Sequence, residues 1–74
     1  MTLVNVKFHS MEQVGVFVEQ MTRLPYKIEL TKENAKIDGK SLLGILSFGL
    51  EEPLLLSAHT EDSLTFIEKI SPYL

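Results

Sequence analysis

Asp38-Gly39-Lys40-Ser41-Leu42-Leu43-Gly44-Ile45-Leu46-Ser47-Phe48-Gly49-Leu50 is the stretch that decides the fold of this chain. Asp38-Gly39 is a turn dipeptide. The Ser41 hydroxyl that follows can cap a helix N-terminus. Gly49 permits the left-handed backbone conformation with which many helices end. We therefore predict a short helix over residues 41–48, with a turn on each side.

Strands are predicted on both sides of this short helix. Upstream, residues 26–30 and 35–38 alternate apolar and polar side chains around the polar turn TKEN, which predicts a hairpin. Downstream, PLLLSAH predicts another strand over residues 53–59. At the N-terminus, Val4, Val6 and Phe8 alternate with polar residues, so we predict a first strand over residues 3–8.

A long amphipathic helix is predicted over residues 11–23. Ser10 and Gln13 form a capping-box pattern at its start, and Pro25 ends it. Gly15 costs about 1 kcal/mol relative to Ala inside a helix, so we expect it to pack closely against a sheet. The apolar stripe repeats at helical spacing and consists of Met11, Val14, Phe17, Val18, Met21 and Leu24.

The last predicted helix begins at Thr60 as its cap, with Glu61 and Asp62 in the first turn, where the helix dipole favours acidic residues. Its expected buried stripe is Leu64, Ile67, Ile70 and Leu74. The whole order is strand, helix, strand, strand, short helix, strand, helix (βαββαβα). Such short strands joined by a hairpin predict an α+β fold, a four-stranded antiparallel sheet with three helices on one face.

Composition narrows the function classes. A chain of 74 residues makes a single domain, residues 1–74, and its 45% hydrophobic content supports a folded core. It contains no cysteine, and His9 and His59 lie in no metal-ligand spacing, so we expect no metal and no cofactor. A net charge of −3 with dispersed basic residues argues against nucleic-acid binding. The sequence has neither a secretory signal pattern nor a membrane span, and we expect a cytoplasmic protein.

Residues 40–49 read Lys-Ser-apolar-apolar-Gly-apolar-apolar-Ser-apolar-Gly. With the element order, this run resembles HPr, the small histidine phosphocarrier of the bacterial sugar phosphotransferase system, over nearly the whole chain. The resemblance implies an open-faced β-sandwich of four antiparallel strands and three helices. It also implies partners among the proteins of the phosphotransferase system or its regulators.

The chain departs from this family at the phosphorylated histidine. The family carries Gly-apolar-His-Ala-Arg-Pro-Ala at the start of the first helix, whereas this chain has Phe8-His9-Ser10-Met11-Glu12-Gln13. Counting back from Lys40 places Ser10 at the histidine position, and one inserted residue places His9 there. The glycine and the arginine are missing. A phosphoryl dianion is stabilised by a helix N-terminus and by a bidentate arginine, and it is destabilised by a nearby carboxylate. His9 is therefore only a weak candidate acceptor.

Ser41 matches the serine at which the resembled family is phosphorylated by a regulatory serine kinase. The residue pattern alone predicts a helix cap, and the two roles are compatible. A phosphate at Ser41 would add negative charge at a helix N-terminus, which the dipole favours, with Lys40 alongside. We expect Ser41 to be exposed.

The short helix is too apolar to bury every side chain, because only one side of it meets the sheet. We expect some of its apolar residues to be exposed and to form a contact surface. In the resembled family this helix and the first one dock partner proteins. The candidate partner-binding residues are Leu42, Leu43, Leu46 and Phe48.

These observations predict a binding or regulatory module related to the phosphotransferase system that has lost histidine carrier chemistry and is not an enzyme. Two alternatives stay open. The chain is an active phosphocarrier that accepts the phosphoryl group on His9, or it is an interaction module that forms a homodimer.

Overall fold

A computed structural model describes all 74 residues and confirms the predicted element order. The elements are β1 (Thr2–Val6), α1 (Met11–Thr22), β2 (Ile28–Lys32), β3 (Ala35–Asp38), α2 (Leu42–Phe48), β4 (Leu54–Ala58), α3 (Ser63–Ile70) and the 3₁₀ turn η1 (Ser71–Tyr73).

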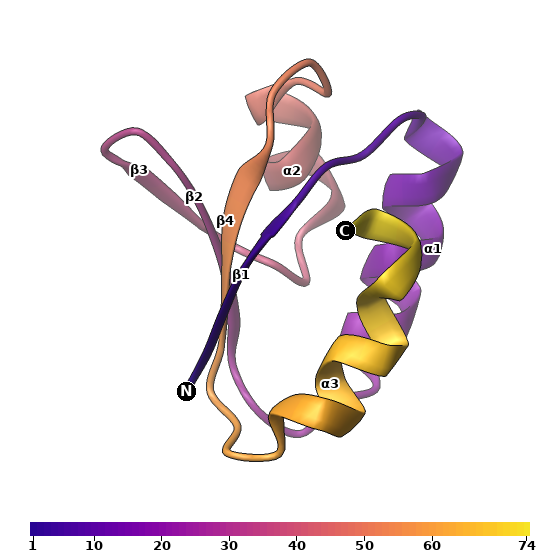
Figure 1. The fold of residues 1–74 in the computed structure, drawn as a ribbon. Coiled ribbons are helices and arrows are strands. Elements are labelled where there is room, and N and C mark those ends of the chain that lie inside the picture. The colour runs from indigo at the N-terminus through magenta and orange to yellow at the C-terminus, as the bar shows by residue number, and fades with distance from the viewer.

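The four strands form one antiparallel sheet in the order β1-β4-β2-β3. Leu56 of β4 lies opposite Val4 of β1 on one side and opposite Leu30 of β2 on the other. The three helices cover one face of this sheet and leave the other face bare (Figure 1). The predicted α+β fold with helices on one face is therefore confirmed.

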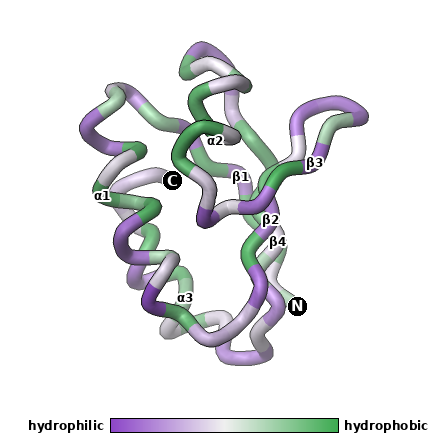
Figure 2. The backbone as a smooth tube through the Cα atoms, turned by 180° about the vertical axis from the view of Figure 1, so that it is seen from behind, coloured by the Kyte–Doolittle hydropathy of each residue, from purple (hydrophilic) through white to green (hydrophobic).

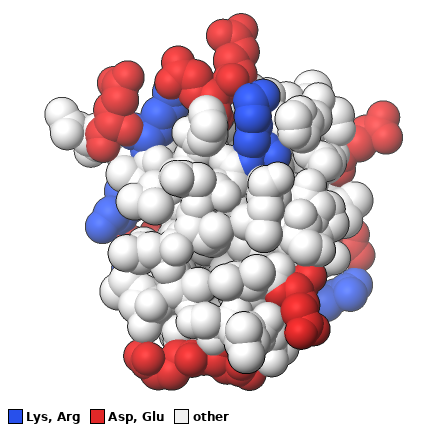
Figure 3. Space-filling view, viewed as in Figure 1, with Lys and Arg blue, Asp and Glu red and all other residues white.

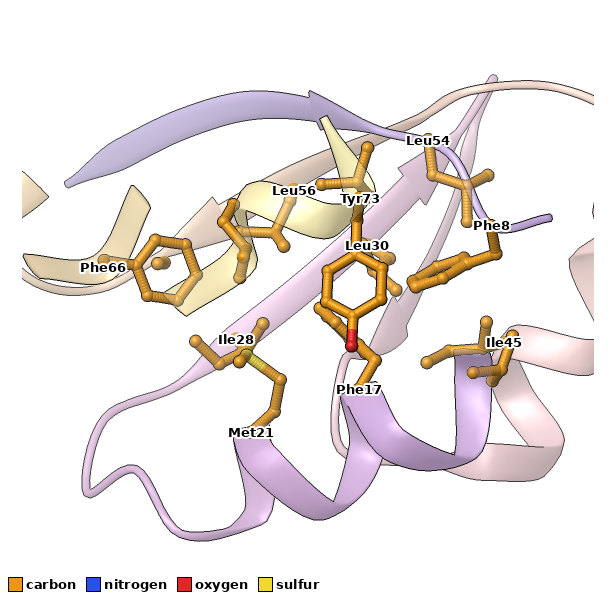
Figure 4. Packing of buried hydrophobic residues seen from close by; sticks show 14 residues of the cluster. Phe8, Phe17, Met21, Ile28, Leu30, Ile45, Leu54, Leu56, Phe66 and Tyr73 are labelled. Carbon is orange, nitrogen blue, oxygen red and sulfur yellow. The ribbon is translucent and has the colours of Figure 1, made fainter. Parts of the chain in front are cut away.

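The core lies between the sheet and the helices (Figure 4). Alternate strand residues supply one side of it, as period-2 patterning requires. Phe8, Phe17 and Tyr73 form an aromatic triad, with ring centroids 4.9 Å apart for Phe8 and Phe17 and 5.2 Å apart for Phe17 and Tyr73. The buried residues are Val6, Phe8, Val14, Phe17, Met21, Ile28, Leu30, Ile45, Leu54, Leu56, Ala58, Phe66, Ile70 and Tyr73.

The stripe of α1 is confirmed in its middle and wrong at its start. Val14, Phe17 and Met21 are fully buried, but Met11 is 66% exposed. Met11 is the first residue of the helix, so no preceding helical turn covers its side chain.

The last helix begins later than predicted. Its cap is Asp62, whose Oδ1 accepts a hydrogen bond from the Thr65 N–H at 3.3 Å. Thr60 instead forms a local turn, accepting from the Asp62 N–H at 3.1 Å. Asp is as good a helix cap as Thr, and a Thr hydroxyl can also stabilise a turn. Asp62 can therefore cap the helix while Thr60 stabilises the turn before it.

The predicted buried stripe of this helix is confirmed at Ile70 and wrong at Leu64 and Leu74, and Ile67 is half-buried. Phe66 and Ile70, spaced i and i+4, are buried, whereas Leu64 is 79% exposed. The chain then tightens into η1, so that Tyr73 enters the core and Leu74 is left 59% exposed. Three residues per turn replace 3.6 in such a helix, which shifts the inward-facing position.

The hairpin is shifted relative to the prediction. Its first strand runs from Ile28 to Lys32, and its turn is the dipeptide Glu33-Asn34 rather than TKEN. Tyr26 lies before the strand and packs edge-on against Phe66, with ring centroids 6.1 Å apart. The shift leaves Ile28 and Leu30 facing the core as the alternation predicts, whereas Ala35 of β3 is exposed.

Two glycines are expected to respond oppositely to substitution by alanine. A Cβ on Gly39 would lie 2.5 Å from Ile28 Cγ2 and 3.2 Å from the Ile28 carbonyl oxygen, so Gly39→Ala should destabilise the fold by roughly 1–3 kcal/mol. A Cβ on Gly15 would meet nothing within 4 Å, which contradicts the close packing expected there. Gly15→Ala should therefore stabilise the helix by about 1 kcal/mol.

Thermal melts of the two variants check this pair. A rise of roughly 4–8 °C is expected for Gly15→Ala, by the usual relation between free energy and melting temperature in small domains. Equal melting temperatures for the two variants would contradict the packing described at Gly39.

Candidate functional site

His9 lies at the start of α1 and is exposed. It follows the buried Phe8 and precedes Ser10, the cap of the helix. Its ring makes no hydrogen bond. The histidine thus stands where a helix N-terminus can attract an anion, as expected from the sequence.

The first turn of α1 is already closed by its own side chains. Ser10 Oγ accepts a hydrogen bond from the Gln13 N–H at 3.1 Å, and Gln13 Oε1 accepts from the His9 N–H at 2.8 Å. The capping box is confirmed, with the glutamine reaching one residue further back than usual. The N–H groups of Ser10, Met11 and Glu12 at this helix end remain for another acceptor.

No arginine can reach His9. The only arginine of the chain is Arg23, at the opposite end of α1, where it pairs with Glu19 at 3.0 Å. At 1.5 Å of rise per residue, the helix separates Arg23 from Met11 by about 18 Å. The exposed Glu12 stands in the first turn instead. Lys7 is the nearest cation to His9 in the sequence, and the buried Phe8 lies between them. Lys7 was not among the predicted site residues.

An open pocket of about 370 Å³ lies beside this helix end, and no pattern in the sequence predicts it. It forms because η1 lies against one side of α1, where the Tyr73 hydroxyl donates to Gln20 Oε1 at 3.2 Å. Burial raises the pKa of Tyr73 above its usual value, so the phenol stays a donor. The lining residues are Ser10, Glu12, Gln13, Val16, Gln20, Pro72 and Tyr73.

Ser41 caps α2 as predicted, and its Oγ accepts from the Gly44 N–H at 3.1 Å. It is half-buried rather than exposed, because it packs over Gly44, where an added Cβ would lie 3.1 Å from Ser41 Oγ. The Lys40 ammonium is also engaged, since it donates to the Leu24 carbonyl at 2.8 Å. The cation expected beside Ser41 therefore ties α2 to the end of α1.

The apolar residues of α2 divide into two groups. Ile45 is fully buried, and Leu46 and Phe48 are half-buried against the core. Leu42 and Leu43 are exposed, to 43% and 80% of their surface. Seen from behind, the helix is apolar along most of its length (Figure 2). Of the four candidate docking residues, only Leu42 and Leu43 are therefore exposed, and only Leu43 presents most of its surface to solvent.

His59 lies away from His9, after β4, and pairs with Glu29 of β2, with 3.3 Å between Nε2 and Oε1. Burial alone would raise the pKa of Glu29, but the His59 hydrogen bond and the charges of Lys27 and Lys36 outweigh it and lower that pKa below its usual value. Nowhere do three His, Asp or Glu side chains gather to hold a metal ion. No helix is long and apolar enough to cross a membrane.

Comparison with known proteins bears on the fold. No family model and no curated protein matches this sequence. Among solved structures, HPr-C-His from Thermoanaerobacter tengcongensis is 25% identical with a TM-score of 0.77, covering 97% of this chain and 89% of that one. A phosphocarrier protein HPr from Bacillus anthracis str. Ames is 18% identical with a TM-score of 0.76, covering 99% of this chain and 95% of that one. The chain therefore has the fold of the HPr phosphocarrier proteins.

Proposed function

We propose that this protein is an HPr-like module of the phosphotransferase system that binds or regulates partner proteins and no longer carries a phosphoryl group. The observation that carries this proposal is the start of α1, where the Ser10 hydroxyl accepts from the Gln13 N–H and the Gln13 side chain accepts from the His9 N–H. Its partners would be proteins of that system or its regulators, and that role places it in the cytoplasm.

The chemistry of transfer explains why this helix start suits an acceptor poorly. A phosphoryl group on His9 would carry close to two negative charges and three acceptor oxygens. It would find the free N–H groups of Ser10, Met11 and Glu12 at the helix end, no arginine, and the carboxylate of Glu12 in the same turn. Like charge in the first turn opposes the anion that the helix dipole favours.

The alternative of a working phosphocarrier rests on two features of His9. Its side chain is exposed, and Lys7, two residues earlier in the sequence, provides a nearby cation. A lysine offers a point charge without the bidentate geometry of arginine. Phosphorylation of His9 by the first enzyme of the system would establish this alternative.

Docking through α2 is expected to depend on Leu43. Leu43→Glu should reduce the affinity for the HPr-binding proteins of the system at least tenfold, because it places a charge in the apolar contact. The matched control is Leu64→Glu on α3, since Leu64 is 79% exposed and Leu43 is 80% exposed. Both variants should melt with a free energy within about 0.5 kcal/mol of the wild type.

Isothermal titration calorimetry with each purified partner measures these affinities. Equal affinities for wild type and Leu43→Glu would contradict docking through α2. No binding to any of these proteins by the wild type would contradict the proposed function itself.

Ser41 is proposed as a regulatory phosphorylation site. Lys40, Ser41 and the apolar residues after them match the family pattern, and a phosphate oxygen can accept the Gly44 N–H that Ser41 Oγ now accepts. Because Ser41 is half-buried, we expect its modification by a cognate serine kinase to be slower than that of a genuine HPr. Peptide mapping after treatment with kinase and ATP, with Ser41→Ala as the control, measures it. A phosphate on another residue would leave Ser41 as a helix cap only.

A further inference from the structure

β1 forms one edge of the sheet and lacks the features that usually protect an edge strand. Its residues, Thr2–Val6, include no charge and no proline. The opposite edge, β3, carries Lys36 and Asp38. Edge strands present unpaired backbone groups, and proteins commonly block them with charged residues or proline. The two edges of this sheet are therefore not equivalent.

The hydrogen-bonding pattern shows which backbone groups of β1 are unpaired. The His59 N–H donates to the Lys27 carbonyl at 2.9 Å, toward β2, so the odd-numbered residues of β4 bond to β2 and the even-numbered ones bond to β1. By the same alternation, Thr2, Val4 and Val6 of β1 pair with β4. The N–H and C=O groups of Leu3 and Asn5 therefore point away from the sheet.

The middle of this edge is open, while its two ends are covered. Thr2 is buried and its Oγ1 lies 2.7 Å from Ser63 Oγ, and the Lys7 N–H donates to the Tyr73 carbonyl at 2.8 Å. Between them Leu3 is 61% exposed and Asn5 is exposed. This side of the molecule faces the viewer in Figure 1, and its centre is free of charged side chains in Figure 3, with acidic and basic groups around the rim.

We propose that β1 pairs with β1 of a second copy, antiparallel, across a two-fold axis at Val4. In this register Leu3 lies opposite the partner's Asn5, and Asn5 opposite the partner's Leu3. Both residues point outward, so each pair exchanges two hydrogen bonds, and all the unpaired groups of both strands are satisfied. The sheet then continues from one protomer into the other.

Self-association suits this edge for electrostatic and geometric reasons. An antiparallel strand of the same sequence satisfies every open group, and no charge is buried at the centre, although each chain carries a net charge of −3. α2 lies away from this edge and stays free for other partners (Figure 1). The inference is thus independent of the proposed function.

Sedimentation equilibrium over roughly 10 µM to 1 mM tests the pairing, a range that covers weak association. The wild type should dimerise reversibly. Asn5→Pro removes an outward N–H that the ladder with β4 does not use, so this variant should fold and remain monomeric. Lys36→Pro makes the same change on an outward position of β3 and should dimerise like the wild type. Should Asn5→Pro fail to fold, Leu3→Lys tests the same edge by placing a charge in the pairing.

Hydrogen exchange supplies a second readout. The Leu3 and Asn5 amides should become protected as protein concentration rises, and the Val4 amide, which bonds to β4, should be protected at every concentration. A wild type that stays monomeric at about 1 mM in sedimentation equilibrium would overturn the proposal. A dimer that persists in folded Asn5→Pro or Leu3→Lys would also overturn the proposal, because the two copies would then associate through another face.

Discussion

Phe17→Ala is expected to destabilise the protein by about 3–5 kcal/mol, the usual cost of removing a buried phenylalanine. Phe17 is fully buried on α1, and its ring meets Phe8 and Tyr73 edge-on or nearly so. Truncation would leave a cavity and also remove aromatic pairs worth about 0.5–1.5 kcal/mol each beyond their buried area. A domain of this size has only about 5 kcal/mol of stability, so the variant should be largely unfolded or close to it.

Urea denaturation followed by circular dichroism measures this loss. Val16→Ala is the matched control, because Val16 is the preceding residue of α1 and is 52% exposed. Its effect should stay near 0.5 kcal/mol, as for other surface changes. A loss below about 1 kcal/mol for Phe17→Ala, close to that of a surface change, would show that the aromatic triad does not hold β1, α1 and η1 together.

Local patterns in the sequence predict most of this fold. The alternation of Val4, Val6 and Phe8 and the repeat of Val14, Phe17 and Met21 each specify a buried face, and both faces are buried as predicted. The helix caps were predicted correctly where the sequence offers a single capping hydroxyl, as at Ser10 and Ser41. These features depend on contacts between residues near in sequence, so the sequence carries them directly.

The wrong predictions depend on contacts between distant segments or on competing caps. Thr60 and Asp62 are both good caps. A helix capped by Thr60 would start earlier than α3 does and would bury a different stripe of side chains. Gly15 was expected to approach the sheet, but the space beside it is open. The position of Tyr73 depends on packing against Phe8 and Phe17, far away in the sequence.

The sequence predicted which residues belong to the candidate site better than it predicted what surrounds them. Excess apolar character on α2 indicated exposed side chains, but only the structure distinguishes Leu42 and Leu43 from the half-buried Leu46 and Phe48. The partial burial of Ser41 follows from its packing over Gly44. Lys40 was expected near Ser41, yet its ammonium bonds the carbonyl of Leu24, which is not a sequence neighbour.

The protein is expected to accept no phosphoryl group from the first enzyme of the phosphotransferase system. The free N–H groups at the α1 N-terminus are few, because Ser10 and Gln13 cap the turn. The only arginine is held by Glu19 at the far end of the helix, and the carboxylate of Glu12 opposes the incoming charge. Losing one charge-assisted hydrogen bond to an anion costs about 1.5–3 kcal/mol, so these differences together disfavour the phosphorylated state strongly.

The direct test is intact-mass spectrometry of the protein after incubation with phosphoenolpyruvate and that enzyme, under conditions that fully phosphorylate a genuine HPr in the same tube. The account predicts that the HPr gains one phosphoryl group and that this protein keeps its unmodified mass. An acid-labile phosphoryl adduct on this protein that disappears in His9→Ala would contradict the account and establish His9 as a working carrier.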